Sequence, residues 1–261
     1  MTVPFIFVSI NVSALPQAGW RLRCIIVVNE NKKIKISPRL MACAEYVPQG
    51  ATLVDVGTDH AYLPVWLIQN GKVSVPVIAG DINEGPLNKA RSSAKEYGVE
   101  NDIVFMLNNG LAGTRESLAD TVVIAGMGGE TIMDIIKASE WEWQGHTLIL
   151  QPMSKIYELS RGLYENGFYI ESERLIRDNG EIYRVMLVKP GEREMPSAIE
   201  LYAGNSDRED PLYKEYVSGL IKKFSRMEKG MAASEKADGA LLDEARSLHK
   251  AALELGKEIG L

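Results

Sequence analysis

The sequence predicts an α/β protein with one doubly wound, mostly parallel sheet, followed by an antiparallel helical hairpin. Between residues 53 and 166, short apolar runs alternate with helical segments, as βαβ units require. Two longer runs, 168–177 and 182–188, then flank Asp-Asn-Gly at 178–180, a turn typical of β-hairpins. Beyond residue 213, apolar residues recur at alternating spacings of four and three, which predicts two packed helices.

The parallel part of the sheet is expected to contain five strands, connected by helices and turns. The expected strands cover residues 53–56, 75–79, 103–107, 121–125 and 147–150. The expected helices cover residues 37–47, 61–70, 84–97, 130–138 and a stretch ending near residue 166. Ser37 is a typical N-cap with Pro38 behind it, and Gly71 and Gly98 stand where left-handed helix caps are common. Because the last two runs form a hairpin, one strand should run opposite to the others.

The chain is long enough for one sizeable α/β core and an appendage. We expect residues 35–196 to form the main domain and residues 197–261 the helical hairpin, whereas residues 1–34 show no clear period and form an extension of unknown role. The expected seam of the hairpin consists of Tyr213, Val217, Leu220, Phe224, Met227 and Met231 on one helix and Leu241, Ala245, Leu248, Ala252, Leu255 and Ile259 on the other. Gly230, Asp238 and Gly239 predict the break between them.

Composition limits the class of protein. The net charge of -6 gives no global field that attracts nucleic acid, so a nucleic-acid substrate would need a local basic patch. Cys24 and Cys43 are too few and too far apart for a disulfide scaffold or a metal site, so we expect no metal and a reducing, cytoplasmic compartment. The apolar run 5–10 is soon interrupted, so no signal peptide or membrane span is expected. Nothing indicates an oligomeric partner.

Two groups of basic residues each have two interpretations. One group surrounds the start of the first helix: Lys32, Lys33, Lys35 and Arg39. The other lies late in the main domain: Arg161, Arg174, Arg177 and Arg184. Either group forms solvated surface or contacts the phosphates of a nucleic acid.

The most informative residues follow the first strand. Asp55 lies in an apolar strand, where a carboxylate needs hydrogen-bond donors or a cationic ligand. After Gly57, the loop contains Asp59 and His60 instead of the glycine spacing of a dinucleotide site. An acidic loop repels phosphate. An acid two residues before such a glycine is instead typical of Rossmann-like methyltransferases, whose cofactor S-adenosyl-L-methionine carries an ammonium and a sulfonium.

Asp81 ends the second strand, roughly 20 residues beyond the glycine turn. An acid at this point is placed to accept hydrogen bonds from both hydroxyls of an adenosine ribose. The alternative is that Asp81 caps the following helix.

Three further segments identify a family. The sequence has Asp-Val-Gly-Thr-Asp-His-Ala-Tyr-Leu-Pro at 55–64, Ala-Gly-Met-Gly-Gly at 125–129, and Gln151-Pro152 followed by Gly167-Phe168 and Glu-x-Leu-Ile at 173–176. With these segments, residues 36–260 resemble the bacterial TrmK family, which methylates N1 of adenine 22 in tRNA. The resemblance implies the seven-stranded fold of class I methyltransferases, S-adenosyl-L-methionine as cofactor and tRNA as partner.

The resemblance also implies a cofactor site at the ends of the strands. Its residues here are Asp55, Gly57, Asp81, Ile82, Asn108, Asn109, Gly110, Ala125 and Gly126. The adenine is expected beside Asn108, Asn109 and Gly110. The family usually has Asp-Gly where this chain has Asn109-Gly110, and an asparagine can also hydrogen-bond an adenine edge.

For catalysis we expect Asp59 and His60 to face the incoming base. N1 of adenine has a free lone pair at neutral pH, so orientation matters more than a general base. Residues 125–129 lack the Asp/Asn-Pro-Pro-aromatic segment of enzymes that methylate exocyclic amines, which favours a ring nitrogen. The substrate-binding candidates are Tyr62, Met127, Gly128, Gly129 and Arg161.

Each of these residues also has a structural interpretation. His60 and Tyr62 are alternatively packing residues, and the glycines alternatively form a tight strand-to-helix turn. At the level of function, two rivals stay open: a methyltransferase acting on a small molecule or a protein, and a non-catalytic module that binds S-adenosyl-L-methionine or RNA.

Overall fold

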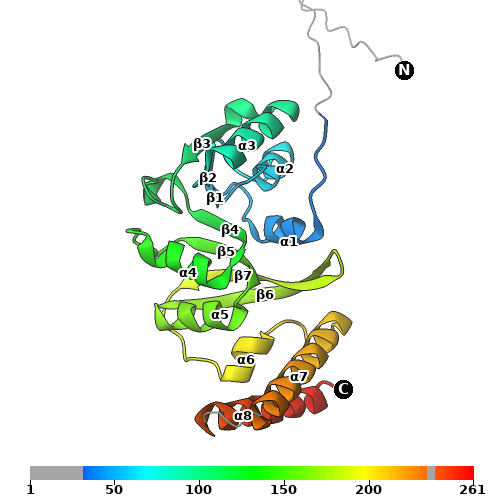
Figure 1. The fold of residues 1–261 in the computed structure, drawn as a ribbon. Helices are drawn as coiled ribbons and strands as arrows, with labels where there is room; N and C mark the ends of the chain where they lie inside the picture. The colour runs from blue at the N-terminus through cyan, green and yellow to red at the C-terminus, as the bar shows by residue number, and fades with distance from the viewer. Residues whose placement is uncertain (1–31, 234–238) are drawn as a thin grey trace, which may run out of the picture.

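A seven-stranded mixed sheet lies at the centre of the protein (Figure 1). The computed structural model describes residues 32–233 and 239–261. The strand order is β3-β2-β1-β4-β5-β7-β6. The strands are β1 (Leu53–Val56), β2 (Val77–Asp81), β3 (Ile103–Leu107), β4 (Thr121–Gly128), β5 (Thr147–Ser154), β6 (Phe168–Asp178) and β7 (Glu181–Pro190). Strands β1 to β5 pair in parallel and β7 pairs antiparallel to both β5 and β6, so the predicted doubly wound sheet with one reversed strand is confirmed.

Helices cover both faces of the sheet (Figure 1). The helices are α1 (Pro38–Tyr46), α2 (Tyr62–Gln69), α3 (Glu84–Glu96), α4 (Gly129–Ala138), α5 (Ile156–Glu165), α6 (Ala198–Ala203), α7 (Pro211–Ala232) and α8 (Gly239–Glu258). Two short 3-10 turns, η1 (Glu100–Asp102) and η2 (Glu116–Leu118), precede β3 and β4. As predicted, Ser37 caps α1, because its hydroxyl accepts from the Leu40 amide.

The central strands are apolar on both faces because each face packs against helices. In β4, Val122 and Ile124 belong to the cluster with α4 and α5, whereas Val123 belongs to the cluster with α1 and α2. Each fully buried aliphatic side chain of this kind contributes roughly 1.5 to 3 kcal/mol. This two-sided burial explains the continuous apolar runs in the sequence.

Strands β4 and β5 are longer than predicted. The pairing continues beyond Ala125, with Met127 opposite Pro152 and Gly128 opposite Ser154, and the register shifts around Met127. Bulges of this kind let a glycine-rich segment stay paired while it bends. Residues 126–128, which the sequence predicts as a turn, are therefore still part of the sheet. Strand β2 begins two residues later than predicted, because Pro76 has no N–H to donate to a strand ladder.

The predicted helical hairpin is present and lies beyond β6, at the end of the molecule opposite β3 (Figure 1). Most of the expected seam is buried or partly buried, including Phe224 and Leu248. Leu241 is an exception, since it lies in the first turn of α8 with its side chain exposed. Gly230 does not break the first helix, because α7 continues to Ala232, and a single glycine costs a helix only about 1 kcal/mol. Asp238 lies outside the described residues.

A buried ion pair connects the hairpin to the sheet. Arg184 of β7 is almost fully buried and bonds the carboxylate of Glu173 on β6, with its Nε 3.0 Å from Oε2. Its Nη1 donates to the carbonyl of Leu201 at 2.9 Å, at the base of the hairpin. Arg184 is therefore neither a groove residue nor a solvated one, and both interpretations of it from the sequence are wrong. Breaking such a pair by removing one partner costs roughly 3 to 5 kcal/mol.

The segment before α1 packs onto the main domain. Ile34 is buried in a cluster with residues of α2, α3 and β2, and its amide donates to the Gln69 side chain at 3.0 Å. Lys32 forms an ion pair with Glu96 at 2.6 Å. The remainder of the predicted extension, residues 1–31, lies outside the described residues. Within the described residues, no helix is long and apolar enough to cross a membrane.

Candidate functional site

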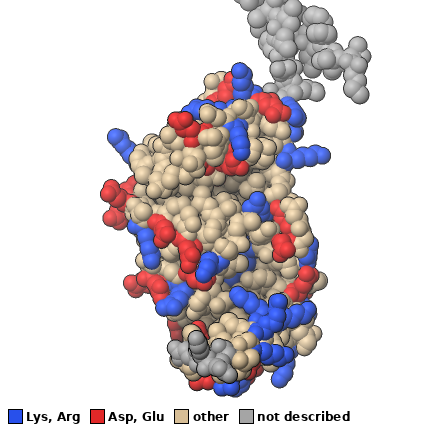
Figure 2. Space-filling view, viewed as in Figure 1, with Lys and Arg blue, Asp and Glu red and all other residues tan. Residues whose placement is uncertain are grey.

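A cavity of about 370 Å³ lies at the carboxyl ends of β1, β2 and β3, where the strand order reverses between β1 and β4. Ligands of open α/β sheets bind at such a switch point. In Figure 2 the surface is hollowed between the part formed by β1 to β3 and the part formed by α4 and α5. The cavity is lined by Val56, Gly57, Gly80, Asp81, Ile82, Asn108, Asn109, Gly110, Leu111, Ala112, Met127, Thr131, Asp134, Ile135, Ala138 and Ser139. Seven of the predicted site residues are among them: Gly57, Asp81, Ile82, Asn108, Asn109, Gly110 and Met127.

The turn after β1 is fixed by glycine. Gly57 has a φ of +76°, and its amide and that of Thr58 both donate to the Gly80 carbonyl, at 2.8 and 3.0 Å. A Cβ at position 57 would overlap with the terminal methyl of Met127. The backbone conformation therefore favours glycine, and a Cβ at this position would displace the flexible end of Met127.

Asp81 faces the cavity from the end of β2. Its Oδ1 accepts from the amide of Asn83 at 2.8 Å, and Asn83, not Asp81, occupies the N-cap of α3. The alternative interpretation of Asp81 as the helix cap is therefore wrong. The second carboxylate oxygen is in no hydrogen bond with any described residue and stays available to a ligand in the cavity.

Asn108 forms the wall of the cavity beyond β3. Its Nδ2 donates to the Ala112 carbonyl at 3.0 Å and to the Thr114 hydroxyl at 3.3 Å. Its buried Oδ1 has no hydrogen-bond partner among the described residues. A buried acceptor without a partner is costly, so this atom suits a ligand that donates a hydrogen bond. Gly110 follows with a φ of +60° and packs closely on Ile135 of α4.

Asp55 lies beneath the turn and does not line the cavity. Burial raises the pKa of its carboxyl to about 6, the nearby Thr58 hydroxyl lowers it, and the negative charge of Asp81 raises it further. A cationic ligand group near the turn would favour the ionised form.

The predicted catalytic pair lies on the exposed rim of the same loop. The Asp59 carboxylate is 3.6 Å from His60 Nε2 and 3.6 Å from the ammonium of Lys89 on α3. The His60 ring stacks on Tyr62, with 4.9 Å between the ring centroids. Asp59 and Ala61 both have positive φ, a strained conformation that is common at functional sites. None of Asp59, His60 and Tyr62 lines the cavity.

The residues of the glycine segment, 125–129, have different positions relative to the cavity. Ala125 and Gly126 lie outside the cavity, whereas Met127 lines it. Gly128 lies beside Ser154 of β5. Gly129 is buried where a Cβ would overlap with the carbonyl of Lys155, so it allows α4 to pack on the start of α5.

The arginines proposed as tRNA contacts carry acidic partners. Arg161 on α5 is exposed, forms an ion pair with Glu165 at 2.7 Å and does not line the cavity. Arg174 forms an ion pair with Glu45, and Arg177 forms one with Glu215 at 2.5 Å. The structure therefore does not bring Arg161 to the other predicted residues.

Reasoning from the sequence missed one wall of the cavity. That wall is a single face of α4, made by Thr131, Asp134, Ile135 and Ala138, with Ser139 after the helix. Their spacing of three and four is the available signal, since it places them on one side of a helix that follows the glycine segment. It also missed the contacts of Gln151 with Arg39, at 3.0 Å, and with the Gly126 amide, at 3.2 Å, although neither Arg39 nor Gln151 lines the cavity.

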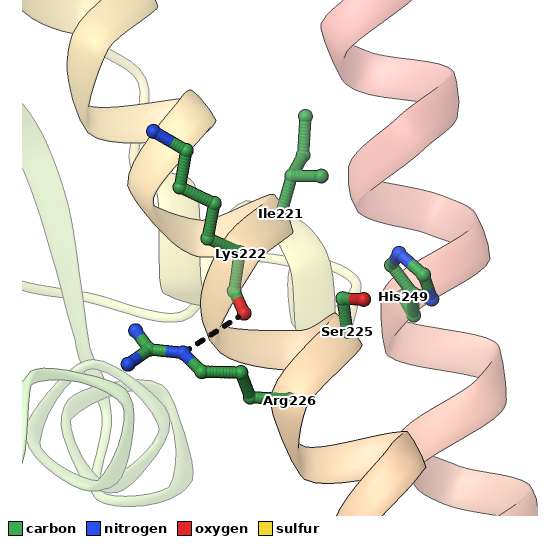
Figure 3. Close-up of a pocket in the computed structure, with 5 residues that line it drawn as sticks. All are labelled: Ile221, Lys222, Ser225, Arg226 and His249. Carbon is green, nitrogen blue, oxygen red and sulfur yellow. Dashed lines mark hydrogen bonds between the residues drawn. The ribbon is translucent and has the colours of Figure 1, made fainter.

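A second, shallower groove of about 520 Å³ lies between the helices of the hairpin (Figure 3). Ile221, Lys222, Ser225 and Arg226 come from α7, and His249 comes from α8. Arg226 Nε donates to the Lys222 carbonyl at 3.3 Å, and His249 Nδ1 lies 2.7 Å from Glu228. The groove is basic and open, so it suits contact with an anionic surface better than enclosure of a small molecule. Across residues 32–233 and 239–261, no cluster of three or more histidines, cysteines or acids is placed to hold a metal ion.

Comparisons with known proteins agree with this geometry. A methyltransferase domain family matches residues 36–186. The chain is 35% identical over 174 residues to a tRNA (adenine(22)-N(1))-methyltransferase of Bacillus subtilis, covering 66% of this chain and 73% of that protein. The crystal structure of the B. subtilis m1A22 tRNA methyltransferase TrmK is similar with a TM-score of 0.77 and 25% identity, covering 86% of this chain and 100% of that one. A Streptococcus pneumoniae structure in complex with S-adenosyl-L-methionine is similar with a TM-score of 0.74 and 29% identity, covering 85% of this chain and 100% of that one.

Proposed function

This chain belongs to the TrmK family of tRNA (adenine(22)-N(1))-methyltransferases, and we propose that it transfers the methyl group of S-adenosyl-L-methionine to N1 of adenine 22 in tRNA. The observation that carries the proposal is the cavity at the reversal of strand order, where Asp81 and Asn108 lie together. A tRNA substrate implies that the enzyme works in the cytoplasm.

The residues of the cavity fit the proposed cofactor. The free oxygen of Asp81 would accept from the ribose hydroxyls, and the unpartnered Oδ1 of Asn108 would accept from the exocyclic amine of the adenine. Asp55, buried beneath the turn, would hold the cationic amino group at Gly57. When bound, S-adenosyl-L-methionine supplies an electrophilic methyl group on a sulfonium.

The chain's own task in the transfer is to orient and stabilise the base. N1 of adenine needs no deprotonation before it attacks, so no described residue has to act as a strong base. Methylation leaves the adenine cationic, and the Asp59 carboxylate beside His60 would stabilise that charge more than the neutral ground state. Tyr62, exposed and already stacked on His60, offers an aromatic face to an extruded base.

The tRNA body would bind outside the cavity, and the hairpin is the part of the chain that suits it. Lys222, Lys223 and Arg226 lie on α7, and in Figure 2 Lys and Arg side chains gather around this helix. They form the local basic patch that a protein with a net charge of -6 needs to bind RNA. We propose that residues 35–196 bind the cofactor and target base and that residues 197–261 hold the tRNA.

Two measurements on the purified protein test the proposal against its rivals. Calorimetry with S-adenosyl-L-methionine is expected to show binding, whereas a module that binds RNA alone would show none, and a module that binds the cofactor without catalysis would transfer no methyl group in the assay that follows. A tritiated-methyl assay is expected to label unmodified tRNA and not a pool of metabolites or proteins. Label in the metabolite or protein fraction alone would favour the alternative substrate class.

A further inference from the structure

The side chain of Gln151 accepts a hydrogen bond from the backbone of the glycine segment. Gly126 has a φ of +81° and lies in a bulge, so its amide has no partner in the β4–β5 ladder. That amide donates instead to the side-chain oxygen of Gln151, at 3.2 Å. The residue opposite the bulge, Pro152, donates no backbone hydrogen bond, and its carbonyl accepts from Gln151 Nε2 at 2.9 Å. A fully buried glutamine thus fixes the point where β4 bends.

Arg39 in turn fixes Gln151. From α1, its Nη1 donates to the same Gln151 oxygen at 3.0 Å and to the sulfur of Met153 at 3.4 Å. Its Nε lies 3.4 Å from Oδ2 of Asp178, a buried carboxylate oxygen with no hydrogen-bond partner among the described residues. The guanidinium also lies over the ring of Tyr183, 5.8 Å from its centroid. Four elements, α1, β5, β6 and β7, therefore hold one side chain in place.

The segment that this network holds separates two regions of the site. Met127 lines the cofactor cavity and packs against Gly57, whereas its neighbour Gly126 is exposed and lies within reach of Arg39. A shift of Gly126 would move Met127, and a misplacement of about 1 Å near a reacting centre costs up to about a hundredfold in rate.

We propose that Arg39 and Gln151 are positioning residues for methyl transfer, acting as a relay that sets Gly126 and Met127 against the target base. The expected effect on the rate of methyl transfer rests on the proposed function. It predicts that loss of either residue lowers the rate of the chemical step and leaves cofactor and tRNA binding largely intact.

The test uses the full-length protein, four variants and one control variant. Gln151→Met removes the acceptor at similar volume, Gln151→Glu keeps an acceptor, and Arg39→Met removes the cation that orients it. The fourth is the double variant Arg39→Met/Gln151→Met. Gln144→Met, at an exposed turn position, is the matched control. Single-turnover rate, KM for tRNA and calorimetric affinity for S-adenosyl-L-methionine are measured for each.

We expect Gln151→Met and Arg39→Met to lower the single-turnover rate by about tenfold or more, with KM and cofactor affinity within about threefold of wild type. Gln151→Glu keeps the acceptor for the Gly126 amide but loses the donor to the Pro152 carbonyl, so its rate should lie between those of Gln151→Met and the wild type. The double variant should be no slower than the slower single variant, because both substitutions break one relay. If Arg39→Met instead raises KM for tRNA at unchanged rate and its effect adds to that of Gln151→Met, Arg39 contacts tRNA phosphate and the relay is wrong.

A readout on the protein alone separates failure of the relay from failure of the proposed function. In protein labelled with ¹⁵N-glycine, the Gly126 amide signal should shift and exchange faster in Gln151→Met and Arg39→Met, but not in Gln144→Met. If the signal position and the exchange rate of the Gly126 amide are unchanged in both variants, the proposal that Arg39 and Gln151 position Gly126 is wrong, whatever the substrate. Arg39 is partly exposed, so its variant keeps the test valid if Gln151→Met does not fold.

Discussion

Replacing Asp55 by asparagine is expected to stabilise the cofactor-free protein at neutral pH and to weaken cofactor binding. Asp55 is buried under the glycine turn, and burial raises its pKa from 3.8 to about 6. The folded protein therefore holds a proton at mildly acidic pH that the unfolded chain has lost. Stability of the wild type should fall as pH rises from about 4 to about 6, because ionisation costs more in the folded state. Asparagine has nearly the same shape and does not ionise.

The size of the effect follows from the two pKa values. A difference of about two pKa units corresponds to about 3 kcal/mol of lost stability once pH exceeds both values. At about pH 5 roughly half of this penalty is present, so the advantage of Asp55→Asn should grow by about 1.5 kcal/mol between pH 5 and pH 7.5. For a protein of this size, that corresponds to a rise of roughly 3 to 6 °C in the difference between the melting temperatures.

Thermal unfolding of the wild type and Asp55→Asn at both pH values, without cofactor, measures this difference directly. Any cost of the asparagine that does not depend on pH cancels in the comparison. Calorimetry should also show at least about a tenfold loss of affinity for S-adenosyl-L-methionine in the variant, because the ligand's ammonium loses its charged partner. A difference in melting temperature that is the same at both pH values would refute the assignment of a raised pKa to Asp55. Unchanged cofactor affinity would refute its role under the turn.

Three further predictions concern the same loop and cavity. Asp81→Ala should lower calorimetric affinity for S-adenosyl-L-methionine by about tenfold or more in a folded protein, and unchanged affinity would sink the ribose assignment. Gly57→Ala should lower cofactor affinity more than Gly50→Ala, because both positions have similar positive φ but only position 57 lines the cavity and would displace the Met127 methyl; equal affinities of the two variants would contradict this. Alanine at Asp59 or His60 should lower the single-turnover rate far more than cofactor affinity, and proportional losses would place the pair in the cofactor site instead.

The parts of the site that the sequence predicts well are those tied to strand ends. Gly57, Asp81 and Asn108 each follow an apolar run, and parallel strands bring their carboxyl ends to one edge of the sheet. The strand order then places all three around one cavity. For such residues, correct strand assignment is almost sufficient.

The sequence does not predict the roles of residues that depend on side-chain contacts between distant parts of the chain. Arg184 reads as a surface residue, yet it is buried because Glu173, on the neighbouring strand, neutralises it. Gln151 and Pro152 read as the end of a strand, since proline usually terminates pairing, but the bulge in β4 keeps them inside the sheet. The same bulge turns Gln151 toward Gly126, a contact that no spacing in the sequence indicates.

The position and the atom of methylation are the most direct test of the proposed specificity. Wild-type protein is incubated with S-adenosyl-L-methionine and an unmodified tRNA, or with the same tRNA carrying guanine at position 22, and the digested nucleosides are identified by mass spectrometry. We expect 1-methyladenosine from the first tRNA, mapped to position 22, and no methylation of the second. Methylation of both tRNAs, a methyl group on the exocyclic amine, or no methylation by folded, cofactor-bound protein would contradict this expectation.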